Sequence, residues 1–293
     1  MANLKEIRTR ITSVNSTMQI TSAMKMVSAA KLKRAQNAVV QMRPYAEKLQ
    51  EILSNISASL DTADNEFIKP REEKKILVVA LSSNRGLCGG FNNNVIKQAK
   101  KIAEETNSSK IEVLPVGKKA YDAFKNSDLL AKQKELPNDL ELLWGNLSFD
   151  KTSSFAENLM NRFLDGSYDK IVLVYNSFKN AGVQILITEQ FLPIVNNESD
   201  SADSSTSVDY IFEPSKEEIV TNLIPNSLKT TLYKAMLDSN ASEHGARMTA
   251  MHKATDNASE MIKELKLTYN KARQASITNE ILEIVGGAEA LNN

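Results

Sequence analysis

The sequence predicts an α/β protein in which the two ends of the chain form a long antiparallel two-helix coiled coil and the middle forms an α/β domain. Apolar and small residues recur at alternating steps of three and four at both ends, which is the spacing of a helix wrapped around a partner helix. Between the ends, short apolar runs alternate with helical patterns. The expected boundaries are residues 1–62 for the N-terminal helix, 75–195 for the α/β domain and 208–293 for the C-terminal helical region.

The N-terminal helix is predicted from one apolar seam. A phase slip interrupts the seam after Met18, and such a slip locally unwinds a coil without ending it. Pro44 is a candidate kink, because proline removes one backbone donor. Polar residues and Pro70 break the pattern after Leu60. The seam consists of Leu4, Ile7, Ile11, Val14 and Met18, and then of Leu32, Ala35, Val39, Met42, Ala46, Leu49, Leu53, Ile56 and Leu60.

The middle of the chain has the pattern of a Rossmann-like α/β domain. Four expected strands, at residues 76–81, 111–116, 171–175 and 183–191, accompany expected helices at 94–105, 118–125 and 149–164. Strands that alternate with helices indicate a mostly parallel sheet with crossover helices. The last two strands are joined through Asn180-Ala181-Gly182, which predicts an antiparallel hairpin. Residues 196–207, rich in Ser, Asp and Asn, are expected to form a loop.

The C-terminal region carries the second seam. Its helix is expected to begin at Pro214, to be interrupted at Pro225 and to restart with a cap at Asn226 or Ser227. Two helices with one seam each are most simply satisfied by each other. Beyond the seam the last turns are apolar almost all round, which predicts a sleeve formed by other chains. The seam is Met248, Met251, Thr255, Ala258, Ile262, Leu265, Tyr269, Ala272, Ser276 and Asn279, and the apolar tip is Ile281, Leu282, Ile284 and Val285.

Composition excludes several classes of function. Lys plus Arg and Asp plus Glu both number 36, so overall charge favours neither nucleic acid nor a membrane surface as partner. Seven cations face a single acid in the first forty residues; this collar is read first as a solvated helix face and second as a site for an acidic loop or a phosphate backbone. Cys88 is the only cysteine, which excludes an internal disulfide. No run is long enough to span a bilayer and the start has no leader pattern, so a cytosolic chain is expected.

The chain offers no credible active site, cofactor site or metal site of its own. The one Gly-rich loop, residues 83–90, follows a strand, but it has neither G-x-G-x-x-G nor a Gly-Lys-Ser/Thr ending, and a tight turn with Gly for close packing is the favoured interpretation. His244 and His252 are too far apart to share a metal without help, and both are expected to be solvated. Cys88 has no neighbouring histidine, which favours a packed thiol over a reactive one.

Two other classes of function remain open at this point. A coiled-coil nucleic-acid binder fits the basic collar, but the first forty residues lack base-stacking aromatics and Glu280, Glu283 and Glu289 make the C-terminal tip acidic. An enzyme with a nucleotide-binding domain fits the strand–loop–helix pattern, but the phosphate-binding motif is missing. Salt-dependent binding to duplex DNA tests the first class, and nucleotide titration tests the second.

Five motifs, in order, resemble the γ subunit of rotary F-type ATP synthases of the bacterial type. They lie at residues 20–27 with Lys31, 85–90, 246–251, 254–258 and 270–288. The closing run, Asn-Lys-Ala-Arg-Gln-Ala-Ser-Ile-Thr-Asn-Glu with Glu-Ile-Val-Gly-Gly-Ala, is the most specific. Asn279 stands where the family commonly has glutamine. The resemblance covers the whole chain, and residues 196–207 are a local departure from it.

The resemblance implies a non-catalytic central-stalk rotor subunit. Its coiled coil would turn inside the ring of α and β subunits, and its α/β domain would hold the ε subunit and rest on the proton-driven c-ring. The chain would be peripheral, at the cytoplasmic face of the bacterial plasma membrane, touching the membrane only through the c-ring and binding no nucleic acid. Carried over by position, the expected β-subunit contacts are Met24, Lys25, Arg247, Gln274, Thr278 and Glu280, and the expected c-ring contacts are Tyr210, Phe212 and Glu213.

Overall fold

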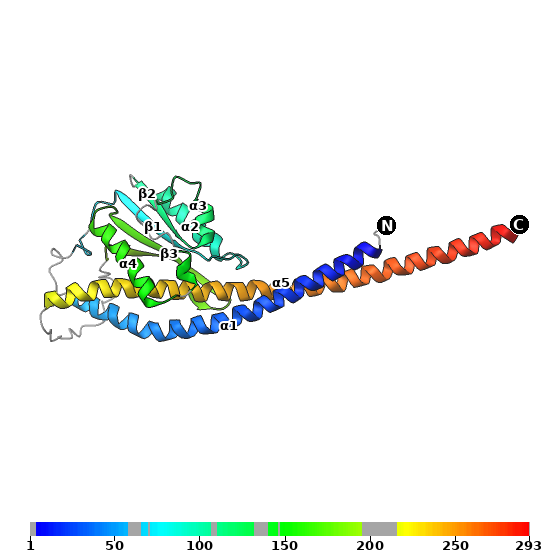
Figure 1. Cartoon of the computed structure of the whole chain (residues 1–293), viewed down its shortest axis with the longest axis horizontal. Coiled ribbons are helices and arrows are strands. Elements are labelled where there is room, and N and C mark those ends of the chain that lie inside the picture. Colours follow the sequence, from blue (N-terminus) through cyan, green and yellow to red (C-terminus); the bar gives the residue numbers. More distant parts are fainter. Residues whose placement is uncertain are drawn as a thin grey trace. The chain divides into compact units, whose positions relative to one another are not determined.

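The computed structural model describes residues 4–57, 66–69, 71–106, 110–131, 140–145, 147–194 and 216–292. Long helices at both ends and a mixed sheet between them confirm the predicted fold class (Figure 1). The elements in order are α1 (Leu4–Ser57), β1 (Lys75–Leu81), α2 (Phe91–Glu105), β2 (Lys110–Val116), α3 (Lys118–Phe124), the 3-10 helix η2 (Leu142–Trp144), α4 (Phe149–Leu164), β3 (Lys170–Asn180), β4 (Val183–Leu192) and α5 (Lys216–Asn292).

The expected break at Pro225 is wrong, because α5 is one helix with Pro225 inside it. A proline inside a helix costs on the order of 3 kcal/mol. Leu228 and Leu232, which follow it on the same helix, are buried in the core of the α/β domain, and their burial offsets that cost. Pro44 likewise lies inside α1 without ending it.

The chain divides into two compact units. The first unit joins Met1–Ser28 to Met248–Asn293, and the second unit is Ala29–Arg247. The predicted domain boundaries at 62, 75, 195 and 208 stay predictions.

The sheet of the second unit has the strand order β2-β1-β3-β4. β1 pairs in parallel with β2 and with β3, so that Ile76 lies opposite Ile111 on one side and Lys170 on the other. β3 and β4 pair antiparallel. Both the parallel part and the hairpin agree with the sequence prediction.

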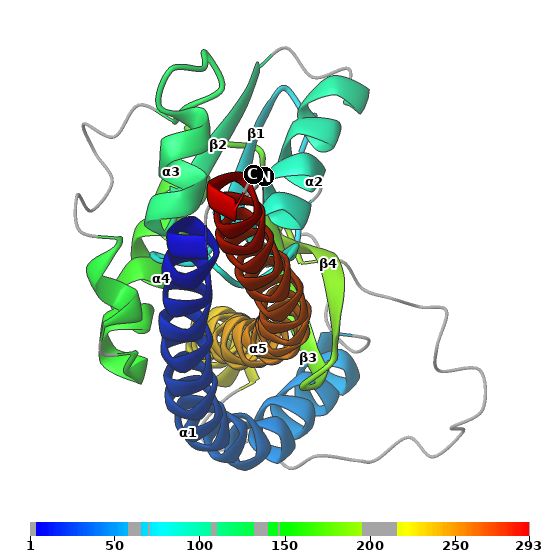
Figure 2. The ribbon, with the colours of Figure 1, turned by 90° about the vertical axis from the view of Figure 1, so that its right-hand side faces the viewer.

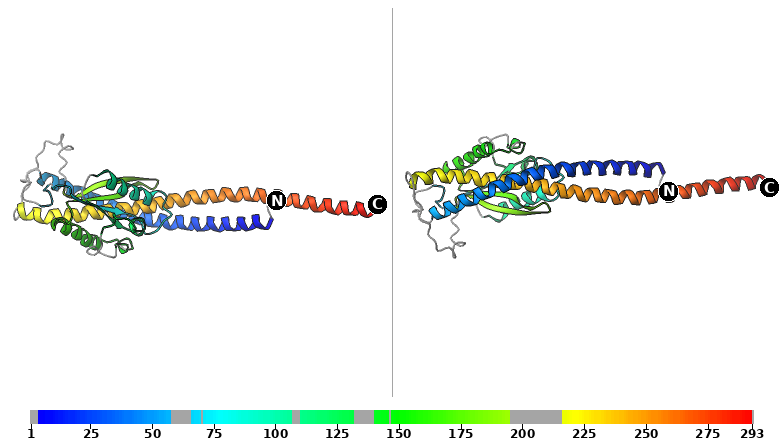
Figure 3. Two further views of the ribbon diagram at one scale, coloured as in Figure 1. Left: turned by 90° about the horizontal axis from the view of Figure 1, so that it is seen from above. Right: turned by 90° about the horizontal axis from the view of Figure 1, so that it is seen from below.

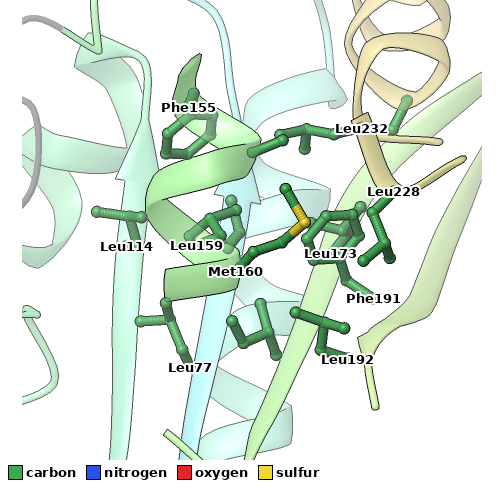
Figure 4. Packing of buried hydrophobic residues seen from close by; sticks show 14 of the residues in the cluster. Leu77, Leu114, Phe155, Leu159, Met160, Leu173, Phe191, Leu192, Leu228 and Leu232 are labelled. Atoms are coloured by element: carbon green, nitrogen blue, oxygen red, sulfur yellow. The ribbon is translucent and has the colours of Figure 1, made fainter. Parts of the chain in front are cut away.

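Alternating residues of β1 enter two different cores, because successive side chains of a strand point to opposite faces. Leu77, Val79 and Leu81 pack with α4 and with the part of α5 in this unit. Figure 4 shows this cluster, in which Leu228 and Leu232 of α5 belong to the same core as Phe191 and Leu173. The residues between them, such as Val78, pack on the other face with α2 and α3. The sheet therefore lies between two helical layers, one of which includes α5.

In the first unit, Leu4–Ser28 of α1 lies beside the part of α5 that begins at Met248 (Figure 2). The Thr255 hydroxyl donates to the Thr21 hydroxyl at 2.9 Å, and Lys25 Nζ lies 3.3 Å from His252 Nδ1. As the residue number rises from Thr21 to Lys25 on α1, the number of the contacting residue on α5 falls from Thr255 to His252. The two helices are therefore antiparallel, as the two seams predicted. Ile7, Met251, Ala258 and Ile262 are buried there.

No helix among the described residues is long and apolar enough to cross a bilayer. The described part of the chain also contains no cluster of His, Cys, Asp and Glu side chains that could hold a metal ion.

Candidate functional site

The C-terminal part of α5 is an exposed apolar surface. By the register of the helix pair, Leu4 lies opposite residues near Ala272, and α5 runs on past that point (Figure 3). The exposed fractions of the five apolar side chains there range from 47 to 72%. A monomeric soluble protein rarely exposes so continuous an apolar helix surface, so this surface is suited to binding a partner. The five residues, here called the tip cluster, are Ile277, Ile281, Leu282, Ile284 and Val285.

The three polar residues predicted to bind near the tip are on this same stretch of α5. Gln274, Thr278 and Glu280 are all exposed. The Thr278 hydroxyl donates to the Gln274 carbonyl at 2.9 Å, and the Ser276 hydroxyl donates to Glu280 Oε1 at 3.3 Å. Glu280 retains a second carboxylate oxygen and Gln274 a whole side-chain amide, which are available to a partner's polar groups.

Met24 and Lys25 lie in the same unit, on the part of α1 that pairs with α5. Both side chains are half-buried. Lys25 Nζ contacts His252 Nδ1, and His252 Nδ1 lies 3.3 Å from Asp256 Oδ2. Met26, next along the helix, is 65% exposed. A cation beside exposed apolar side chains is a surface that fits an acidic, partly apolar loop.

Arg247 belongs to the second unit and is only 8% exposed. Its Nη1 lies 2.7 Å from Glu243 Oε1, its Nη2 donates to the Arg85 carbonyl at 3.0 Å, and its Nε donates to the Gly86 carbonyl at 3.3 Å. Burial raises the pKa of the Glu243 carboxyl, and the Arg247 charge acts against that shift. The guanidinium is therefore occupied by groups of its own chain, whereas the family resemblance implied a contact with another subunit. The β-subunit contact stays a prediction.

The Gly-rich loop is a tight turn, but the need for glycine in it is conformational. Gly89 has φ +59°, in the left-handed region, and a Cβ there would meet nothing within 4 Å. The Asn92 side chain holds the loop, since it accepts from the Ser83 backbone N–H at 2.9 Å and donates to Cys88 Sγ at 3.1 Å. Cys88 is 2% exposed and burial raises its thiol pKa, so it is a packed thiol as predicted.

The two predicted solvent-facing histidines differ. His252 is exposed, as expected, but His244 is partly buried, with its Nδ1 3.5 Å from Arg247 Nη1. Burial, together with the positive charges of Arg247 and Lys31, lowers the pKa of His244 to about 4. The expectation of a solvated His244 is wrong, because no local pattern indicates that α5 packs there against the Gly-rich loop.

His244 makes stability depend on pH. Its folded-state pKa lies below the ordinary value of 6.5, so the unfolded chain binds the proton first as the pH falls and stability is lost between about pH 6.5 and 4. Between pH 7 and pH 5 the chain is expected to lose about 1 kcal/mol more than its His244→Gln variant, after allowance for partial solvent screening. Urea unfolding of both chains at both pH values measures this, with His252→Gln as control. Equal losses in all three chains would contradict it.

Asp238 is one of the buried charges that sequence reasoning missed. Asp238 of α5 accepts from the Ser177 hydroxyl of β3 at 3.1 Å, and Arg43 Nη2 of α1 lies 3.7 Å from its other oxygen. Burial raises the pKa of the Asp238 carboxyl. An acid directly after Ala235, Met236 and Leu237 was the available signal, since an acid in an apolar run is expected to have a partner.

Tyr210, Phe212 and Glu213, the predicted c-ring contacts, lie outside the described residues. Their role stays a prediction.

The described part of the chain leaves the apolar end of the helix pair exposed, and the buried Arg247 binds groups of its own chain. These features define a class of protein, a subunit of a larger assembly. Known proteins specify the assembly. The ATP synthase family model matches residues 3–291. The chain is 61% identical to the ATP synthase gamma chain of Flavobacterium psychrophilum over 292 residues, covering 99% of each chain. It is 60% identical to the gamma chain of Flavobacterium johnsoniae over 293 residues, covering 100% of each.

Solved structures agree. A chain in the central stalk and c-ring structure of Tetrahymena thermophila mitochondrial ATP synthase is similar with a TM-score of 0.57 and 25% identity, over 80% of this chain and 99% of that one. A chain of the Euglena gracilis mitochondrial ATP synthase shares the fold, with a TM-score of 0.65 and 24% identity over 98% of this chain and 94% of that one. The chain belongs to the ATP synthase gamma-chain family and is a central-stalk subunit of that assembly. This family is neither of the two other classes considered for the sequence, the nucleic-acid binder and the nucleotide-binding enzyme.

Proposed function

We propose that the paired helices of this chain turn inside the ring of α and β subunits and carry torque between the proton-driven c-ring and the catalytic sites of the β subunits. The tip cluster is the observation that carries the proposal, because its exposed apolar side chains need a sleeve that the described part of the chain does not supply. In this scheme the chain is non-catalytic and catalysis belongs to the β subunits.

Torque transfer requires that the shaft contact each β subunit differently. A rotor changes the conformation of a partner only through a difference in contact free energy between the partner's states. Two helices of unequal reach supply this asymmetry, because α1 extends along α5 only as far as Leu4 and α5 continues alone beyond that point.

Contacts with the β subunits are proposed for two levels of the first unit. Met24 and Lys25 would meet an acidic loop, since a cation there gives an attraction that is screened by salt and can re-form at each step. Gln274, Thr278 and Glu280 would bond to loops around the tip, for which their exposure is suitable. Arg247 would act from inside its own unit.

The remaining partners are proposed from the family alone. The ε subunit would bind the α/β domain, and the c-ring would contact Tyr210, Phe212 and Glu213. As part of a membrane-associated ATP synthase, the chain would lie at the cytoplasmic face of the plasma membrane and reach the membrane only through the c-ring.

Reconstitution tests the proposal. The full chain, mixed with the α and β subunits of the same organism, is expected to give a stoichiometric complex with ATPase activity. The double variant Ile281→Ser and Ile284→Ser is expected to fold as stably as the parent chain, because both side chains are already exposed, and to lower the temperature at which the complex dissociates.

Calorimetry of the free chain and of the complex separates the two effects of that double variant. Lys263→Ala, which removes an exposed cation from the paired part of α5, is the control. Failure of the parent chain to form a complex counts against the proposed function. A complex that dissociates at the same temperature with the double variant as with the parent chain also counts against it.

A further inference from the structure

We propose that Arg247 is a positioning residue that latches α5 to the loop after β1, residues 82–90, so that the α/β domain and α5 turn as one body. The inference rests on the proposed function, because it specifies where torque passes between the domain and the shaft helix. Arg247, the loop and the part of α5 up to Arg247 all belong to the second unit.

The contact is a fork, with each arm on a different acceptor. Nη2 and Nε of Arg247 donate to the carbonyls of Arg85 and Gly86, 162 and 161 residues away in sequence, and Nη1 pairs with Glu243. A planar guanidinium fixes the direction of each of these bonds, which the single ammonium of lysine does not do. The fork therefore fixes the orientation of α5 relative to the loop, in addition to holding the two together.

Glu243 makes the buried cation tolerable. The two side chains are one helical turn apart on α5 and are 9% and 11% exposed. A buried charge without a partner is costly, and here the carboxylate supplies the counter-charge from the same helix. The pair therefore moves with α5 and needs only neutral carbonyls from the loop.

The loop is built for a cation where a nucleotide-binding unit would be built for an anion. In such units the loop after the first strand offers backbone N–H groups and a helix N-terminus to phosphate. Here the Ser83 N–H is bonded to the Asn92 side chain, and the Arg85 and Gly86 carbonyls are turned to Arg247. The same position in the fold thus binds the protein's own guanidinium.

Neighbouring residues of α5 are held by other parts of the domain. Gly245 approaches the Ala181 carbonyl of the β3–β4 turn so closely that a Cβ would lie 3.2 Å from it, and Ala246 packs in a buried cluster with Cys88 and Phe91. Successive helical residues point about 100° apart, so three consecutive positions grip the helix over more than half of its circumference. A helix held in this way cannot roll about its own axis without breaking one of the three contacts.

The gripped segment is continuous with the rest of α5, which runs to Asn292. A rotation imposed on residues 245–247 by the domain is carried along one hydrogen-bonded backbone. A loose contact here would let the domain rotate without rotating the helix by the same angle. Some rotation would then not be passed between the c-ring and the β subunits, and coupling would fall.

Cys88, the only cysteine of the chain, reports on the latch because it is 2% exposed and packs beside Ala246. In Arg247→Ala the full chain is expected to react with a small thiol reagent about tenfold faster, since the loss of charge-assisted bonds makes local opening more frequent. Arg247→Lys, which keeps the charge but not the fork, is expected to react at an intermediate rate. Lys253→Ala, an exposed cation of the same helix, is the control and is expected to react as the parent does.

The second readout is the number of protons pumped per ATP hydrolysed by complexes assembled from these chains. The latch is supported if the ratio of protons pumped to ATP hydrolysed falls at least about threefold in Arg247→Ala. It is also expected to fall in Arg247→Lys, although that chain melts at the same temperature as the parent chain. Should Arg247→Ala fail to fold, Arg247→Lys and Glu243→Gln carry the test. The proposed latch is overturned if Arg247→Ala labels Cys88 faster but pumps as many protons per ATP as the parent chain. It is also overturned if Cys88 is labelled at the parent rate. Failure of the proposed function is distinct, because then the complex with the parent chain does not pump.

Discussion

Gly117→Ala is expected to prevent stable folding of the α/β domain. Gly117 has φ +114°, a conformation that L side chains rarely adopt, and a Cβ there would lie 2.2 Å from the Ser82 carbonyl oxygen and 2.8 Å from its carbon. Backbone atoms cannot give way as the end of a flexible side chain does. The strain and the overlap together are expected to cost more than about 4 kcal/mol, a large part of the stability of an ordinary domain.

The position explains why the backbone cannot move aside. The Ser82 N–H donates to the Val116 carbonyl at 2.8 Å, and the Ser82 hydroxyl accepts from the Ala120 N–H at 2.9 Å, so the ends of β1 and β2 are tied together where α3 begins. Moving Gly117 away would break these bonds between buried groups. The substitution is therefore expected to affect the sheet as a whole and not only one turn.

Gly89→Ala is the matched control, since Gly89 also has a positive φ but has open space around the built Cβ. It is expected to cost only about 1 kcal/mol, the ordinary cost of a left-handed alanine. Urea unfolding of the two full-length variants, followed by circular dichroism, compares them. Similar small losses of stability in both would show that Ser82 yields and would contradict the argument.

The parts of the fold that depend on periodicity could be predicted from the sequence. Leu32, Ala35, Val39, Ala46 and Leu49 of the predicted seam are all buried. The sheet was predictable for the same reason, because a run such as 76–81, with no polar alternation, fits only a strand covered on both faces. For the tip cluster the same kind of pattern predicted an exposed apolar surface, and the described residues leave this surface without a partner.

The contacts that the sequence did not reveal join residues far apart in the chain. Nothing in the neighbourhood of Arg247 indicates that its acceptors are carbonyls more than 160 residues earlier, because every residue offers the same carbonyl. The pairing of Asp238 with Ser177 and Arg43 likewise depends on how three elements meet. The helix break expected at Pro225 was wrong because the tertiary packing of the residues that follow it outweighs the local preference of proline for helix ends.

Met24→Lys is expected to reduce coupling several-fold while it leaves the folded chain nearly as stable as before. Met24 is half-buried on α1, beside Lys25, and a lysine can extend its charged end from such a position into water, so the change in folding stability is expected to be within about 0.5 kcal/mol. In the proposed assembly the new charge would meet the acidic loop of a β subunit. An attraction that is too strong at one angular position holds the rotor there, because each step must then break it.

The measurement is ATP-driven proton pumping per ATP hydrolysed by the assembled complex, together with thermal unfolding of the free chain. Met26→Lys adds the same charge two residues along α1, about 200° around the helix, at a side chain that is already 65% exposed, and it is expected to alter the ratio less. The deficit of Met24→Lys is expected to shrink as ionic strength rises from about 0.05 to 0.5 M, since the Debye length falls below the distance over which exposed charges act. A ratio equal to that of the parent chain at low salt would remove Met24 from the β-subunit contact, and a deficit that does not respond to salt would exclude charge as its cause.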